Sequence, residues 1–170
     1  KKNIILSGKF LLFDNIKQYS SKFYNMLKLL KNIKNKVIIF HPYVKFSGCL
    51  QIGEILRLNG YLSEHDAVNK NCICSKCGIR YLNHNKKITH KFIAARYNII
   101  HGELYKSELT RIKAKFNRGS NIHGDEIKIL IVSSVVIEGH EFMHCNNMFV
   151  MNFPINYSSL IQLYGRIVRK

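Results

Sequence analysis

The last helix predicted in this 170-residue chain carries residues suited to phosphate chemistry. Four of them fit the pattern Gln-x-x-Gly-Arg-x-x-Arg: Gln162, Gly165, Arg166 and Arg169. Residues three and four apart share a helix face, so the glutamine and both arginines are expected to project together, while the glycine permits close packing. Paired guanidinium groups are permanently charged and can stabilise charge on a γ-phosphate. The alternative is a basic last turn that complements the helix dipole.

A second group of residues has side chains that bind metals. Within nineteen positions of a polar segment lie Cys72, Cys74, Cys77, His84 and His90. Cys74 and Cys77 have the spacing of a zinc knuckle, and the glycine after them permits its tight turn. The two histidines would complete a Cys₂His₂ zinc site, with Cys72 as an alternative ligand. A polar loop with reduced thiols is the other interpretation, because the histidine spacing lies at the limit of the usual range.

Apolar periodicity predicts the elements that would position these side chains. Helical spacing favours helices over residues 20–33, 47–59, 104–116 and 158–169, and short apolar runs predict buried strands at 37–40, 97–101, 127–132 and 148–152. Strands that alternate with helices predict an α/β fold with a mostly parallel sheet covered on both faces. The polar segment 62–92 lacks regular periodicity and is expected to be a Cys/His-rich insertion.

Composition narrows the class of protein. A hydrophobic content of 46% is that of a globular domain, and no apolar run approaches the roughly 20 residues that span a bilayer. The net charge of +17 favours a polyanionic partner, nucleic acid above all, although A/T-rich coding also enriches lysine. Five cysteines, an odd count, favour a reducing compartment over a disulfide framework.

Taken in order, four blocks of this sequence resemble the C-terminal RecA-like lobe of superfamily 2 helicases. Residues 36–41 resemble motif IV, 101–117 the His-Gly strand-to-helix segment, 129–139 motif V, and 162–169 motif VI. The resemblance covers residues 20–170 apart from the insertion, and it implies that residues 1–19 connect to an N-terminal lobe outside this chain.

The Cys-x-x-Cys-Gly insertion and the Ser-x-x-x-Glu-Gly form of motif V are similar to one viral branch of that superfamily. This branch includes the small subunit of the poxvirus early transcription factor, nucleoside triphosphate phosphohydrolase I and homologues in other large cytoplasmic DNA viruses. Helicases of yeast cytoplasmic linear plasmids are similar too. The resemblance implies a cytoplasmic location and a role in viral or plasmid transcription.

The resemblance also implies roles for individual residues at the nucleotide. Arg169 corresponds to the arginine finger and Arg166 to its neighbour facing the γ-phosphate, while Gln162 would link nucleotide state to lobe closure. Gly139 and Gly165 belong to the motifs beside the nucleotide. Glu141 stands where relatives often have an aspartate near the ribose, and this departure weakens the expected ribose contact.

Residues at the strand-to-helix turns are the expected contacts to a nucleic-acid backbone, which such enzymes hold mainly by its phosphates. They are His41, Tyr43, Lys45, His101, Gly102, Ser133 and Ser134. Either serine could supply the motif V hydroxyl. DNA and RNA are both compatible with these residue types.

The phosphate loop Gly-x-x-x-x-Gly-Lys-[Ser/Thr] and a strand ending in Asp-Glu are absent from the sequence. ATP and Mg²⁺ are therefore expected to bind mainly to the N-terminal lobe, so that this chain is a fragment inactive alone. RNA polymerase or a transcription factor subunit would be a further partner. The alternative functions are a zinc-stabilised nucleic-acid-binding module without an ATPase role and a degenerate lobe that only scaffolds other proteins.

Overall fold

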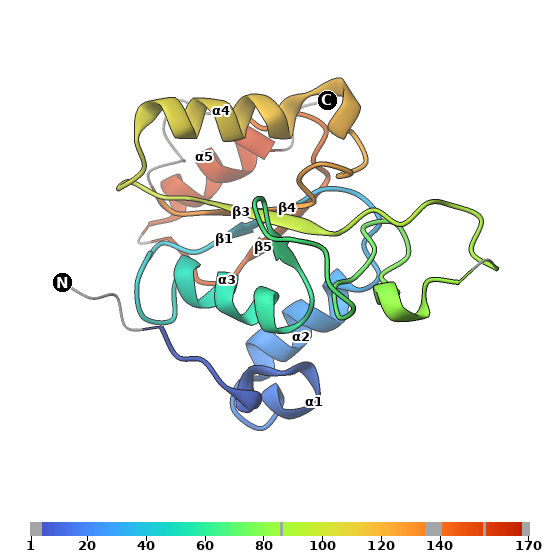
Figure 1. Cartoon of the computed structure of the whole chain (residues 1–170). Helices are drawn as coiled ribbons and strands as arrows, with labels where there is room; N and C mark the ends of the chain where they lie inside the picture. The colour runs from blue at the N-terminus through green and yellow to red at the C-terminus, as the bar shows by residue number, and fades with distance from the viewer. Residues whose placement is uncertain (1–4, 86, 135–140, 155, 168–170) are drawn as a thin grey trace.

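The fold is a five-stranded sheet with helices on both sides (Figure 1). The computed structural model describes residues 5–85, 87–134, 141–154 and 156–167, with residues 166 and 167 described by their backbone only. The strand order is β2-β3-β4-β1-β5, and every pairing is parallel. The strands are β1 (Val37–Phe40), β2 (Leu62–Ser63), β3 (Arg96–Ile100), β4 (Ile129–Val132) and β5 (Asn147–Val150). The predicted α/β fold with a mostly parallel sheet is confirmed.

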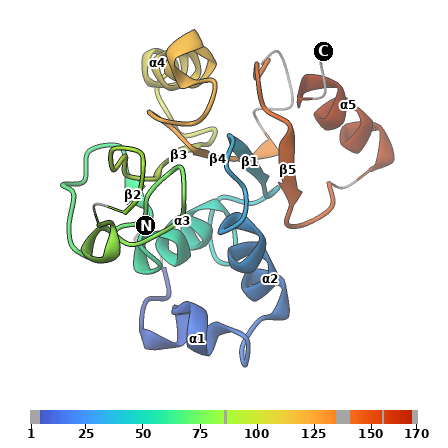
Figure 2. The same ribbon diagram turned by 90° about the vertical axis from the view of Figure 1, so that its right-hand side faces the viewer.

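The helices form two groups, one on each side of the sheet (Figures 1 and 2). On one side lie α1 (Phe13–Ile16), α2 (Ser21–Leu30) and α3 (Cys49–Leu58), and on the other α4 (Lys106–Asn117) and α5 (Tyr157–Ile167). Short 3₁₀ turns occur at Lys9–Leu11, Tyr81–Asn83 and Gly119–Asn121. Among the described residues, no helix has the length and apolar character needed to cross a bilayer.

The central strands explain why the sheet needs cover on both sides. Every residue of β1 and β4 is buried. Because successive side chains of a strand point to opposite faces, Val37 and Ile39 pack with α2 and α3, whereas Ile38 and Phe40 pack with α4 and α5. A continuous apolar run thus builds two cores at once, as expected for a strand in a parallel sheet.

A side chain caps the start of α2 and of α5, and for α5 the capping residue differs from the predicted one. The sequence leaves either Ser20 or Ser21 as the cap of α2; the backbone N–H of Phe23 donates to the Ser20 hydroxyl at 3.3 Å, so Ser20 is the cap. The prediction that Ser158 or Ser159 caps the last helix is wrong. That helix begins at Tyr157, and the Asn156 side chain accepts a hydrogen bond of 2.8 Å from the Ser159 N–H. The cap therefore falls on the residue before the two serines.

Residues 6–16 lie against α3. The Gln51 side chain bonds both the N–H and the carbonyl of Leu6, each at 2.8 Å. Asn59 accepts from the Phe13 N–H at 2.7 Å and donates to the Leu11 carbonyl at 2.9 Å. These polar contacts hold Leu11 and Ile16 in the core that α2 and α3 share.

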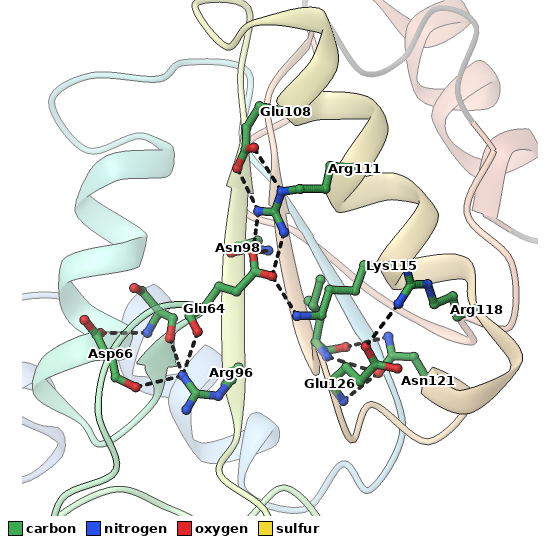
Figure 3. A network of polar contacts seen from close by, with 12 residues as sticks. Glu64, Asp66, Arg96, Asn98, Glu108, Arg111, Lys115, Arg118, Asn121 and Glu126 are labelled. Atoms are coloured by element: carbon green, nitrogen blue, oxygen red, sulfur yellow. Dashed lines mark hydrogen bonds and ion pairs between the residues drawn. The ribbon is translucent and has the colours of Figure 1, made fainter.

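The segment 62–92 contributes an edge strand, which its sequence does not predict. The two residues of β2 pair with the start of β3. A polar network fastens the next turn to the sheet and to α4 (Figure 3). Arg96 donates to the carbonyls of Ser63, Glu64 and Asp66 at 2.7 to 3.0 Å. The buried carboxylate of Glu64 accepts from Arg111 on α4 at 2.7 and 2.8 Å.

Candidate functional site

The expected nucleic-acid-contacting residues follow β1, β3 and β4 at one edge of the sheet. In the parallel register both Phe40 and Ile100 pair with Val132, so the residues after these three strands are neighbours. His41, His101 and Ser133 occupy those positions, and their backbones are linked: His41 N–H donates to the Val132 carbonyl at 3.1 Å and Ser133 N–H to the Ile100 carbonyl at 3.0 Å. Ligands of open α/β sheets characteristically bind beyond such carboxyl ends.

Two of these side chains are buried. The His41 ring is 1% exposed, its Nδ1 accepts from the Tyr43 N–H at 3.2 Å, and burial lowers the pKa of its imidazole. The Ser133 hydroxyl is buried without a hydrogen-bond partner in the described part of the chain. Ser134, by contrast, is exposed and donates to the Pro42 carbonyl at 2.8 Å. The two serines therefore differ: one faces inward, and the other joins the loop after β4 to the loop after β1.

The remaining turn residues are accessible. Tyr43 is 59% exposed, and Gly102 is exposed. Lys45 forms an ion pair of 3.4 Å with Glu103, which connects the loops after β1 and β3. The Glu103 N–H in turn donates to His101 Nδ1 at 3.3 Å. The structure thus brings all seven predicted residues to one edge, where Tyr43, Gly102 and Ser134 are exposed.

Sequence reasoning missed Glu103 and the Pro42 carbonyl as supports of this edge. Glu103 directly follows the His-Gly pair, but the sequence around a single exposed acidic residue does not reveal which basic residue it pairs with. The contact between Ser134 and Pro42 spans 92 positions and depends wholly on strand pairing.

Helix α5 carries the start of the Gln-x-x-Gly-Arg-x-x-Arg pattern, and the structure describes this helix up to Ile167. Leu163 is 3% exposed and packs in the core beneath α4, whereas Gln162 and Gly165 are exposed. In the described part of the chain nothing lies within 4 Å of a Cβ built on Gly165, so the expected close packing is not found there. The Arg166 side chain, Arg169 and Gly139 lie outside what the structure describes.

Glu141, predicted near the ribose, follows the undescribed residues 135–140. Its backbone carbonyl accepts a hydrogen bond of 3.0 Å from the Asn117 side chain at the end of α4. The Asn117 oxygen also accepts from the Met143 N–H at 2.9 Å. The stretch that leads to β5 is therefore held against the last turn of α4.

Four of the five predicted metal ligands come together in the insertion. One ligand atom from each of Cys74, Cys77, His84 and His90 lies within 4.8 Å of all the others. Cys72 stands apart from them, since its Sγ donates to the Asn69 carbonyl at 2.9 Å and its side chain is buried with Leu62. The structure thus separates the knuckle from the third cysteine.

Comparison with known families agrees with this geometry. The helicase conserved C-terminal domain family matches residues 57–170, which include the last two residues of α3, the insertion, the edge formed by β3 and β4, and α5. A solved structure, the C-terminal part of the Fun30 ATPase domain, is similar with a TM-score of 0.56 over 92% of this chain and 38% of that one. At 19% identity it supports the fold alone.

Viral proteins are similar in sequence. An early transcription factor large subunit homologue of African swine fever virus (isolate Pig/Kenya/KEN-50/1950) is 36% identical over 89% of this chain. Nucleoside triphosphatase I of Melanoplus sanguinipes entomopoxvirus is 27% identical over 96%. This chain spans only 14% and 20% of their lengths. The resemblance to the large DNA virus branch is confirmed, although the first relative is named for the large subunit. By its matched motifs, sheet and viral relatives, this chain belongs to the helicase conserved C-terminal domain family of superfamily 2.

Proposed function

We propose that this chain is the C-terminal lobe of a nucleic-acid-dependent ATPase and supplies the arginine finger to a nucleotide held mainly by an N-terminal lobe. The observation that supports this proposal is the orientation of α5, which buries Leu163 and exposes Gln162. The Gln-x-x-Gly-Arg-x-x-Arg spacing of the sequence assigns Arg166 and Arg169 to the same helix face as Gln162, because residues three or four apart share a face. ATP and Mg²⁺ would bridge the two lobes, with Gly139, Glu141 and Gly165 beside the nucleotide.

The carboxyl edge of β1, β3 and β4 is the proposed track for nucleic acid. Tyr43, Lys45, Gly102 and Ser134 are accessible there, and the chain carries a net charge of +17. His41, His101 and Ser133 would shape the turns that carry these residues. Closure of two lobes around ATP would move the strand along this edge, gripping phosphates without reading bases.

The cellular setting is a further part of the proposal. One similar protein is named an early transcription factor subunit homologue and another a nucleoside triphosphatase. These names support a role in viral transcription beside an RNA polymerase or a transcription factor subunit, in the cytoplasm where such thiols stay reduced.

The decisive experiment uses the full-length protein. We expect Arg169→Ala to lower ATP turnover by about 10³-fold or more, because an arginine finger stabilises charge in the transition state. Nucleic-acid binding should change little. Lys28→Ala, which removes an exposed positive charge from α2, serves as the matched control and should retain turnover. Normal turnover in the Arg169 variant would refute the proposed role.

A further inference from the structure

The four clustered side chains of the insertion have the spacing of a metal coordination shell. His90 Nε2 lies 3.4 Å from Cys74 Sγ and 3.3 Å from His84 Nε2. Ligands around a tetrahedral zinc, with Zn–N and Zn–S bonds of usual length, lie about 3.3 to 3.8 Å from one another. A ring nitrogen carries either one proton or one lone pair, so His90 Nε2 cannot hydrogen-bond both neighbours at once. A central cation would satisfy all four groups.

The cysteine half has the backbone of a knuckle. Gly78 adopts a φ of +70°, and its N–H donates to the Cys74 carbonyl at 2.9 Å. The Cys74 N–H donates to the Ile79 carbonyl, also at 2.9 Å. A side chain at position 78 would be strained, because this φ favours glycine and a Cβ would meet the Lys31 carbonyl oxygen at 3.1 Å. The turn thus presents both sulfurs on one side.

The histidine half is oriented by aromatic contacts. The His84 ring meets the His90 ring and the Phe92 ring edge to face, at centroid distances of 5.1 and 5.3 Å. Tyr81 also packs edge to face on Phe92, at a centroid distance of 4.8 Å. Both imidazoles are only partly exposed, and these ring contacts orient them.

The knuckle is also fastened to the body of the lobe. Ser75, between the two cysteines, is buried; its hydroxyl donates to the Gly124 carbonyl at 2.8 Å, and its N–H to the Ile93 carbonyl at 2.7 Å. The buried ammonium of Lys128, just before β4, donates to the Ser75 carbonyl. A metal bound at the knuckle would therefore join residues 84–90 to the base of the sheet.

We propose that Cys74, Cys77, His84 and His90 bind one structural zinc ion that clamps the insertion onto the sheet. Four protein ligands leave no open position for substrate, which distinguishes a structural from a catalytic site. Two thiolates also balance the charge of Zn²⁺. Cys72 is not a ligand. The site needs no nucleotide, so it can exist whether or not the proposed ATPase function is correct.

Zinc content of the full-length protein tests the ligand set. We expect Cys74→Ser, Cys77→Ser, His84→Ala and His90→Ala each to lose about one zinc per chain relative to the unmodified protein. Cys72→Ala, a control two positions before Cys74, should keep the zinc. Unchanged zinc in the four variants, or the same loss in the control, would overturn the proposal.

Two measurements guard against variants that merely misfold. Cobalt bound to the unmodified protein at this site should show tetrahedral ligand-field bands and charge-transfer intensity for two thiolates; intensity for none or three contradicts the ligand set.

Removal of the metal by a chelator should expose Lys70, Lys87 and Lys91 to trypsin much faster than Lys106 and Lys113 of α4. Equal cleavage with and without metal would contradict the clamp. Both readouts are independent of ATP turnover, so a failed arginine-finger test leaves them interpretable.

Discussion

At the scale of single residues, Glu64 joins the insertion to β3 and α4 through its carboxylate (Figure 3). Its side chain is 6% exposed and accepts hydrogen bonds from Arg111, from Lys115 at 2.7 Å and from Asn98 at 2.9 Å. The bonds from Arg111, more than offsetting burial, hold the pKa of this carboxyl well below its usual value. The insertion is thereby tied to α4 by an ionised acid.

We predict that Glu64→Gln lowers the free energy of unfolding at neutral pH by about 1 to 3 kcal/mol, because charge-assisted hydrogen bonds are lost while their donors remain. The folded-state pKa lies below the unfolded value, so this stabilisation is complete above about pH 4.5 and declines as the pH falls below it. Urea unfolding at several pH values should show the gap between the two proteins narrowing in acid. Glu103→Gln, at a 63% exposed side chain, should change little. A gap independent of pH would contradict this assignment.

At the scale of elements, α5 matters because it carries the proposed nucleotide-facing residues. Its first turn is capped by Asn156, and its inner face is anchored through Leu163. A helix whose start is frayed would hold the following turns less firmly, since its first N–H groups would lack partners. The geometry of Gln162 thus depends on a residue six positions earlier.

We expect Asn156→Ala to destabilise the protein by about 1 kcal/mol, the usual cost of losing a cap. Amide hydrogen exchange should accelerate at Ser159 and in the rest of the first turn of α5. Ser158→Ala is the matched control, because Asn156 rather than Ser158 caps this helix. Equal acceleration in both variants would show that the cap lies elsewhere.

At the scale of the whole molecule, a buried lysine joins three segments that are distant in sequence. Lys36, immediately before β1, donates to the Phe116 carbonyl at 2.8 Å and to the Met143 carbonyl at 2.7 Å. Its ammonium also lies 4.3 Å from the centre of the Phe116 ring. Burial lowers the pKa of this ammonium, and the two carbonyls accept hydrogen bonds from it. The start of β1, the end of α4 and the approach to β5 therefore share one contact.

Lys36→Met should lower the free energy of unfolding by about 1 to 3 kcal/mol, because it preserves the apolar stem but leaves two carbonyls without their donor. Denaturant unfolding measures this change. Lys28→Met, at an exposed position of α2, should stay within about 0.5 kcal/mol of the unmodified protein. Similar effects of the two substitutions would mean that the buried contact adds no stability.

The amino-acid sequence by itself determined the class of fold, the order of the central strands and the long helices, and the family. Strand runs such as Val37–Phe40 and helix caps such as Ser20 are local patterns, since side-chain direction repeats every two residues in strands and about every 3.6 in helices. The turn residues after β1, β3 and β4 could be predicted to meet, because parallel strands end at a common edge. Gly78 and the cysteine spacing likewise predicted a knuckle.

Only the tertiary structure decided which distant groups share one environment. It placed β2 at the edge, moved the α5 cap to Asn156, and separated Cys72 from the four clustered ligands. The partners of Glu64 and Lys36 lie 34 to 107 positions away in sequence. Such contacts follow from strand pairing and core packing across the whole chain, and no short-range periodicity records them.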